Sequence, residues 1–263
     1  MSPIEQMISR KADGIGWVLF NDPKAMNAIS MEMSAAIPGI IAAHDEDPEV
    51  RVLVVAGMGD RAFAAGSNIS AFGKVRTDAA QNKAYHELNE KSYNSVYECS
   101  KPTIAMIRGY CMGGGLDYAS SCDIRIAADD AVFAIPAARL GLGYGYQGQI
   151  RLNRLIGPAQ ARDLFFSARR YDAHEALRTG LVHEVVPAAE LEARTIEYAR
   201  TVAANAPLTL KAIKRAFLEL EKPESVRDMA IAQRMIDACY ASQDYLEGRA
   251  AFAEKRKPDF KGE

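Results

Sequence analysis

The sequence lacks the features that mark several classes of protein. No stretch of its 263 residues approaches the ~18 consecutive apolar residues that a membrane-spanning helix requires. Its net charge of −2 gives no electrostatic reason to expect nucleic acid or an anionic membrane as a partner. The first residues contain no basic segment followed by an apolar run, so no secretory signal is expected. These absences favour a cytoplasmic globular protein that binds neither nucleic acid nor membrane.

Cysteine and histidine are scarce and scattered. The cysteines form no Cys-x-x-Cys pair, so the sequence indicates neither a zinc site nor a disulfide framework, and free thiols in a reducing compartment are favoured. The histidines also lie far apart, without the spacing of metal ligands. We therefore expect no metal site.

Short apolar segments alternate with helical patterns in the first two thirds of the chain. Expected strands cover residues 6–9, 15–20, 52–56, 103–107, 123–127, 132–134 and 182–186, and expected helices cover 31–44, 79–99, 115–121 and 159–167. Pro38 and Gly39 should kink or split the first of these helices. This alternation predicts an α/β fold, with a largely parallel sheet covered by helices.

The last third of the chain is helical in pattern. Helices are expected over residues 188–205, 207–220, 223–240 and 243–254. We therefore predict a core over residues 1–187 and a C-terminal helical region over 188–263. The apolar faces of these helices need a partner surface, either on their own core or on neighbouring copies.

Two glycine-containing turns each follow a predicted strand. Gly-Gly-Gly at 113–115 follows the strand at 103–107 and opens a helix with Asp117 in its first turn, and Ala-Gly-Ser at 65–67 follows the strand at 52–56. Glycine lets a ligand approach backbone N–H groups, and a helix N-terminus favours negative charge. Two N–H groups directed at one oxygen form an oxyanion hole, in which each donor stabilises a transition state by about 2.7–4 kcal/mol.

Six motifs stand in the order and approximate spacing of one known family. They are Pro-Lys-Ala-Met-Asn-Ala at 23–28, Phe-Ala-Ala-Gly-Ser at 63–67, Gly-Gly-Gly at 113–115, Cys-Asp at 122–123, Gly-Leu-Val at 180–182 and Phe-Ala-Glu-Lys-Arg-Lys at 252–257. Together they resemble the crotonase (enoyl-CoA hydratase/isomerase) superfamily, from about residue 5 to the end. The resemblance implies a spiral core of stacked ββα turns that binds an acyl-CoA substrate. It also implies C-terminal helices that assemble a homotrimer or homohexamer, and no cofactor apart from the coenzyme A of the substrate.

The resemblance also implies roles for individual residues. The backbone N–H groups of Ser67 and Gly114 match the family's oxyanion donors. Asp117 stands where hydratases carry a glutamate, which implies a general acid or base at the α or β carbon of the thioester. Residues implied in binding the substrate and its CoA, the last two often in a neighbouring subunit, are Lys24, Ala25, Ala65, Asn68, Ile69, Phe252 and Lys255.

The sequence departs from the hydratase pattern at a second carboxylate. Hydratases carry another glutamate at the position of Ala137, and dienoyl-CoA isomerases carry a further acid at the position of Gly145. Addition of water needs one group to hold or deprotonate the water and another to deliver the α-proton. The glycine-rich segment 141–148 instead predicts a loop over the acyl pocket. In it, Tyr144 matches the active-site tyrosine of methylmalonyl-CoA decarboxylases, and nearby Arg139 is a candidate ligand for a substrate carboxylate.

Three functions therefore stay open at the level of sequence. The first is an enzyme of the enoyl-CoA hydratase/isomerase type that passes through a thioester enolate. The second is an acyl-CoA decarboxylase or isomerase without hydratase activity, which Ala137 and Tyr144 favour. The third is a catalytically inactive paralogue that still binds acyl-CoA.

Overall fold

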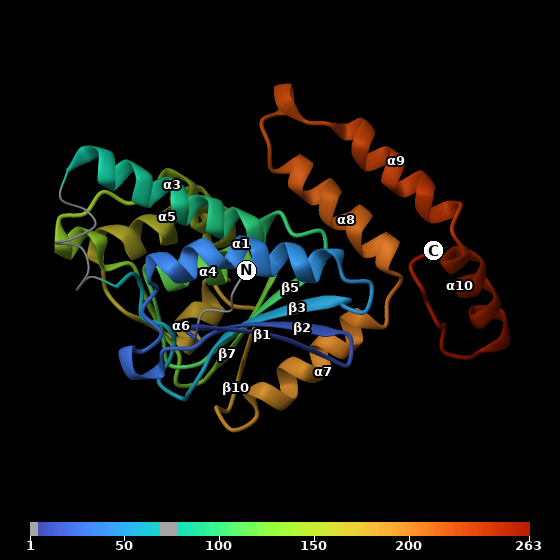
Figure 1. The fold of residues 1–263 in the computed structure, drawn as a ribbon, viewed down its shortest axis with the longest axis horizontal. Helices are drawn as coiled ribbons and strands as arrows, with labels where there is room; N and C mark the ends of the chain where they lie inside the picture. The colour runs from blue at the N-terminus through green and yellow to red at the C-terminus, as the bar shows by residue number, and fades with distance from the viewer. Residues whose placement is uncertain (1–4, 69–77) are drawn as a thin grey trace.

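A computed structural model describes residues 5–68 and 78–263, and its centre is a six-stranded sheet (Figure 1). In the order β1-β2-β3-β5-β7-β10, the strands are Met7–Ala12, Ile15–Phe20, Val52–Gly57, Thr103–Ile107, Ile124–Ala128 and Glu184–Val186. The β1–β2 pair is antiparallel and every other pair is parallel. Six of the seven strand segments expected from the sequence belong to this sheet. The remaining one, residues 132–134, is a strand of a different sheet.

A second, smaller sheet has the order β4-β6-β8-β9, with strands Ala62–Ala64, Tyr110–Met112, Val132–Ala134 and Tyr171–Asp172. Three times, a strand of the large sheet is followed by a strand of the small sheet and then by a helix. The helices are α3 (Ala79–Tyr97), α4 (Gly114–Ser121) and α5 (Tyr146–Ser167). This repeated ββα unit confirms the stacked arrangement that the family resemblance implies.

The large sheet is buried on both faces. Alternate residues of a strand point to opposite faces, and β2 and β3 are apolar at both sets of positions. Val18 and Val55 belong to the core beneath α1 (Met31–Glu46), α3 and α4, whereas Trp17 and Val54 belong to the core beneath α7 (Leu191–Ala203). Figure 1 shows α7 on the opposite side of the sheet from α1 and α4.

Two expectations about helices were wrong. Helix α1 runs through Pro38 as one helix instead of splitting, because Met33, Ile37 and Ile41 bury one continuous face against the core and so offset the backbone hydrogen bond that proline removes. Helix α5 begins at Tyr146 rather than near residue 159. It has a break at Gly157, whose φ of 74° and ψ of 164° are not helical.

The C-terminal helices after α7 extend away from the sheet (Figure 1). They are α8 (Pro207–Leu220), α9 (Met229–Tyr240) and α10 (Gln243–Glu254), and the short helix η4 (Glu224–Val226) lies between α8 and α9. Earlier in the chain are the short helices η3 (Pro136–Leu140) and α6 (Ala173–Arg178). Buried Lys214 fastens α8 to the core, because its ammonium group donates to Asp123 Oδ2 at 2.7 Å and to the Lys101 carbonyl at 3.0 Å. Since α7 packs on the sheet, only α8 to α10 lie apart from it. The division of the chain at residue 187 stays a prediction.

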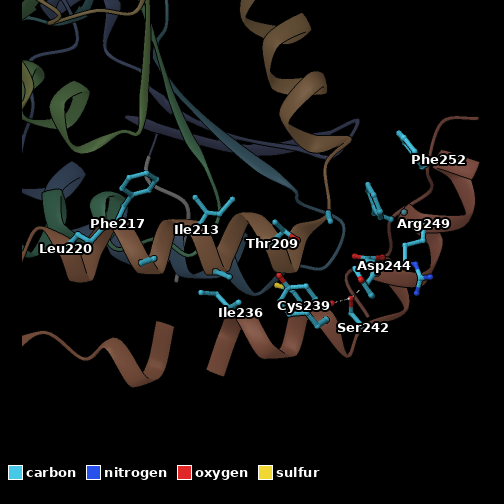
Figure 2. Close-up of a pocket in the computed structure, with 17 residues that line it drawn as sticks. Thr209, Ile213, Phe217, Leu220, Ile236, Cys239, Ser242, Asp244, Arg249 and Phe252 are labelled. Atoms are coloured by element: carbon cyan, nitrogen blue, oxygen red, sulfur yellow. Dashed lines mark hydrogen bonds between the residues drawn. The ribbon is translucent and has the colours of Figure 1, made fainter. Parts of the chain in front are cut away.

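An apolar groove of about 770 Å³ lies between α8, α9 and α10. Figure 2 shows Ile213, Phe217 and Leu220 along α8 on one side of it and Ile236 on α9 on the other. Phe217 is 62% exposed, so this surface is without a partner in one copy of the described chain. No helix in the described part of the chain is both long and apolar enough to cross a membrane.

Candidate active site

A cavity of about 120 Å³ lies where the N-terminus of α4 meets α3 and the segment between β8 and α5. Both glycine-containing turns reach this cavity, as do Asp117 and Tyr144. The lining is mostly apolar and aromatic with a few polar groups, which is typical of a small-molecule site. The other lining residues that concern the chemistry are Ala65, Tyr85, His86, Asn89, Glu90, Tyr93, Ala137, Leu140 and Leu142.

The two turns lie directly against each other. Gly66 has a φ of 101° and Gly113 a φ of 47°, a region that favours glycine. A Cβ at Gly66 would lie 3.1 Å from the Met112 carbonyl oxygen, closer than ordinary contact, so glycine at 66 permits the approach of the two backbones. The structure therefore brings together the two segments whose N–H groups the sequence singles out.

The backbone pairing determines where the Ser67 N–H points. Ile29 donates to the Gly66 carbonyl at 2.8 Å, and Asn68 donates to the Ile29 carbonyl at 2.9 Å. Because N–H groups alternate along an extended chain, the Ser67 N–H faces away from Ile29. Gly114 is the first residue of α4, so its N–H has no acceptor within the helix. Among the backbone hydrogen bonds of the described residues, neither of these two N–H groups donates to a carbonyl.

Asp117 lies in the first turn of α4 and is only 6% exposed. The Tyr144 hydroxyl donates to Asp117 Oδ2 at 2.6 Å, which fixes the plane of the carboxyl group. The other oxygen, Oδ1, lies 3.8 Å from Arg151 Nη2 and accepts no hydrogen bond from the described part of the chain. One oxygen of Asp117 is thus held by Tyr144, and the other is buried beside Arg151 without a hydrogen-bond donor from the described residues.

Burial raises the pKa of Asp117 to about 7. The positive charge of Arg151 and the hydrogen bond from Tyr144 oppose this rise, and the negative charge of Glu90 adds to it. A carboxyl group that titrates near neutral pH can both accept and return a proton under physiological conditions. Burial also raises the pKa of Tyr144, so its hydroxyl remains a donor.

Ala137 lines the cavity from η3. Its methyl side chain brings no carboxylate to the place where hydratases carry a glutamate. Arg139 is exposed and does not line the cavity. The predicted loop over the pocket ends at Gly145, since α5 starts at the next residue. Gly148 lies inside α5, where a Cβ would overlap Asp117 Oδ1 and lie 2.8 Å from Tyr144 Cε1. Glycine at this position allows α5 to approach the carboxylate.

Three residues of the site were missed at the level of sequence: Glu90, Tyr93 and Arg151. Glu90 Oε2 lies 3.6 Å from Arg151 Nη2, and the guanidinium lies over the Tyr93 ring, 5.5 Å from its centroid. A Cβ on Gly114 would lie 2.8 Å from the Tyr93 hydroxyl, so this hydroxyl is next to the turn at 113–115. The sequence does contain one indication that α3 contributes to the site. The buried face of this helix is polar and aromatic, and it carries Tyr85, Asn89, Ser92 and Tyr93.

The residues expected to bind CoA fall into two groups. Lys24 and Ala25 are exposed on η1 (Pro23–Ala25). This helix lies beside the turn at 65–67, because the Ala65 N–H donates to the Met26 carbonyl at 3.0 Å. Asn68 pairs with Ile29 in the same place, and Ile69 lies outside the described residues. Phe252 and Lys255 lie at the end of α10, far from α3 and α5 within one copy (Figure 1).

Among the described residues no group of three or more side chains could hold a metal ion.

Several known proteins resemble this chain in sequence and in fold. The model of the enoyl-CoA hydratase/isomerase family matches residues 10–263. The chain is 35% identical to crotonyl-CoA hydratase of Syntrophomonas wolfei over 97% of this chain and 98% of that protein, and 34% identical to carnitinyl-CoA dehydratase of Salmonella arizonae over 93% and 94%. The structure superimposes with a TM-score of 0.93 on an enoyl-CoA hydratase/carnithine racemase from Magnetospirillum magneticum, at 33% identity, covering 99% of this chain and 97% of that one.

Fold and relatives together define an enzyme with the crotonase fold, a lyase or isomerase that acts on acyl-CoA. The chain belongs to the enoyl-CoA hydratase/isomerase family. The resemblance inferred from the six motifs is therefore confirmed.

Proposed function

We propose that this enzyme stabilises the enolate of an acyl-CoA thioester between the N–H groups of Ser67 and Gly114, with Asp117 moving the proton. The observation that carries the proposal is the position of Asp117, a buried carboxyl group of pKa about 7 beside two adjacent turns with available N–H groups. The thioester oxygen lies between the turns, where the donors meet the negative charge that develops on it.

The reaction begins when Asp117 Oδ1 removes a proton from a carbon of the acyl chain. The C–H bond breaks, its electron pair moves onto the thioester oxygen as an enolate, and the proton goes to the carboxylate. Tyr144 donates a hydrogen bond to the other oxygen, Oδ2, and so fixes the orientation of the carboxyl group. Return of the proton to the same carbon gives exchange, and its return two carbons away gives isomerisation.

One observation favours a second candidate function. Ala137 leaves a site in which η3 supplies no acid, and isomerisation or decarboxylation requires fewer acid–base groups than addition of water. The second candidate is therefore an acyl-CoA isomerase or decarboxylase that lacks hydratase activity.

We propose that the chain forms a homotrimer or homohexamer in which neighbouring copies cover the apolar groove of the C-terminal helices. Exposed Phe217 and Phe252, at 62% and 88%, are of the kind that a neighbouring copy covers. Assembly would also carry Phe252 and Lys255 of one copy toward Lys24 and Ala25 of another, where they would bind the CoA nucleotide. Light scattering after size exclusion tests the assembly, and a monomer would contradict it.

The function is tested by mass spectrometry of acyl-CoA thioesters incubated with the protein in heavy water. The panel contains crotonyl-, butyryl-, methylmalonyl- and dienoyl-CoA. Gain of water, loss of carbon dioxide or deuterium at the α-carbon each identifies one enolate reaction. Binding of the panel without any change would identify an inactive paralogue.

Two variants at one position isolate the oxyanion donor. Gly114→Pro removes the N–H, whereas Gly114→Ala keeps it and adds a Cβ in the same place. We expect the proline variant to turn over 10²–10³-fold more slowly than the alanine variant. Equal rates in the two variants would refute a role for the Gly114 N–H.

A further inference from the structure

We infer that Glu90 and Arg151 are positioning residues for proton transfer at Asp117, because Glu90 competes with Asp117 for one buried guanidinium group. The inference rests on the proposed enolate function and names two residues that control its proton. Glu90 lies on α3 and Arg151 on α5, whereas Asp117 lies on α4. In this role both residues act through Asp117.

The guanidinium group of Arg151 lies almost equally far from the two carboxyl groups. Its Nη2 atom is 3.6 Å from Glu90 Oε2 and 3.8 Å from Asp117 Oδ1. Both distances allow an ion pair but exceed the length of a hydrogen bond, which is about 2.7–3.2 Å. None of these three buried atoms makes a hydrogen bond within the described part of the chain. Because the attraction between charges depends on their distance, neither carboxyl group holds the positive charge alone.

Arg151 is held in this intermediate position by helix α3. Its guanidinium group lies over the Tyr93 ring, 5.5 Å from the centroid, and its Nη1 atom donates to Asn94 Oδ1 at 3.3 Å. The side chain is 5% exposed. A charge buried to this extent is unfavourable without a partner, so Glu90 and Asp117 both stabilise it.

The buried cluster is electrically balanced in only one protonation state of Asp117. When Asp117 is protonated, the charges of Arg151 and Glu90 cancel. When Asp117 is ionised, one negative charge remains. Transfer of a proton from the substrate to Asp117 moves this charge to the thioester oxygen beside Ser67 and Gly114, and the cluster becomes neutral. The arrangement therefore favours a carboxyl group that takes up a proton during the reaction and releases it afterwards.

Removing one partner should change the proton affinity of Asp117 in one direction, and removing the other should reverse the change. Without Glu90, Asp117 would face Arg151 alone, and an opposite charge at this distance lowers the pKa of a carboxyl group. Without Arg151, burial and the negative charge of Glu90 would both raise the pKa. With both residues present, the pKa of Asp117 stays at about 7.

The other titratable groups around Asp117 are the same in all the variants proposed below. Tyr85 and His86 line the cavity from α3. Four further groups carry no charge near neutral pH, because burial raises the pKa of each: Tyr93 on α3, Cys111 on β6, Tyr118 on α4 and Tyr144 before α5. Differences among the variants therefore report on Glu90 and Arg151.

The test is the pH–rate profile of α-proton exchange with saturating butyryl-CoA in heavy water, followed by mass spectrometry. Glu90→Gln keeps the shape of the side chain and removes its charge. We expect the midpoint of the profile to move down by about one pH unit. Because Asp117 then ionises more readily but is a weaker base, exchange should be about threefold slower at pH 9 and about threefold faster at pH 5. Glu87→Gln is the control and should leave the profile unchanged, since Glu87 is exposed on the same helix beside Lys83.

Arg151→Gln should move the midpoint in the opposite direction, up by about one pH unit. The midpoint of the double variant Glu90→Gln/Arg151→Gln should lie between those of the two single variants. Urea unfolding shows whether the Arg151 variants fold. If they do not, Glu90→Gln decides the matter by itself, because structural damage lowers the rate at every pH and does not make exchange faster at pH 5.

Three results would overturn the inference while the proposed function stands. They are an unchanged midpoint in Glu90→Gln, an equal loss of rate at every pH in that variant, and shifts of the two single variants in the same direction. If the wild-type enzyme exchanges no α-proton of any acyl-CoA in the panel, the proposed function fails and the inference fails with it.

Discussion

Replacing Asp117 by asparagine should change the pH dependence of stability in a way that reports directly on its ionisation. Asparagine has the same shape and still accepts the Tyr144 hydrogen bond through its oxygen. It cannot ionise. The comparison between wild type and variant therefore isolates the free energy of holding a charged carboxylate in the first turn of α4.

The magnitude follows from the two pKa values of Asp117. Burial raises the pKa of the folded state to about 7, whereas the ordinary value is 3.8. Between these values the folded protein binds a proton that the unfolded chain releases, so raising the pH removes stability. With 1.36 kcal/mol for each pKa unit, ionisation of Asp117 costs about 4 kcal/mol above pH 8 and about 1.5 kcal/mol at pH 5.

The assay is urea unfolding of both proteins at pH 5 and pH 8. The free energy of unfolding of Asp117→Asn minus that of wild type should increase by about 2.5 kcal/mol from pH 5 to pH 8. Groups common to the two proteins cancel in this difference. Asp60→Asn, at an exposed position, is the control and should show a change below about 0.5 kcal/mol. A similarly small change for Asp117→Asn would refute the raised pKa and with it the proton-transfer role at neutral pH.

Two further substitutions test how the surroundings of Asp117 tune it. Tyr144→Phe removes a hydrogen bond that lowers the pKa of Asp117. The midpoint of the pH–rate profile should therefore move up by about one unit, and the rate at pH 7 should fall about fivefold. A profile identical to wild type would contradict this. Gly148→Ala places a Cβ against Asp117 Oδ1, so we expect a loss of about 1–3 kcal/mol in unfolding free energy and a rate about 10²-fold lower. Gly143→Ala, whose Cβ meets nothing within 4 Å, is its control, and equal effects of the two alanines in urea unfolding and turnover would rule out the steric explanation.

Strands β2, β3, β5 and β7 could be predicted because each is largely apolar over five or six residues. Strands β4, β6 and β9 were not predicted, since they have only two or three residues. Such short segments form strands through pairing with a neighbour that is distant in sequence, as Cys111 pairs with Phe133. No local pattern contains that information.

Helix boundaries failed where packing outweighed local preference. Pro38 lies inside α1, where proline normally ends a helix, because the buried face of α1 continues on both sides of it. The start of α5, residues 146–148, was expected to belong to the glycine-rich loop 141–148. It is helical because Leu152 and Ile156 pack into the core on one face, and because Gly148 fits against Asp117.

The sequence by itself determined the family, the two glycine-containing turns and the place of Asp117 on the first turn of a helix, because all of these depend on residues adjacent in the chain. Only the tertiary structure decided the chemistry around that carboxyl group. Glu90, Arg151 and Tyr144 reach it from α3, α5 and the segment before α5. The pKa of Asp117 depends on burial and on the charges that these distant segments bring within a few ångströms, and the strength of such interactions depends on distance in space and not on separation along the chain.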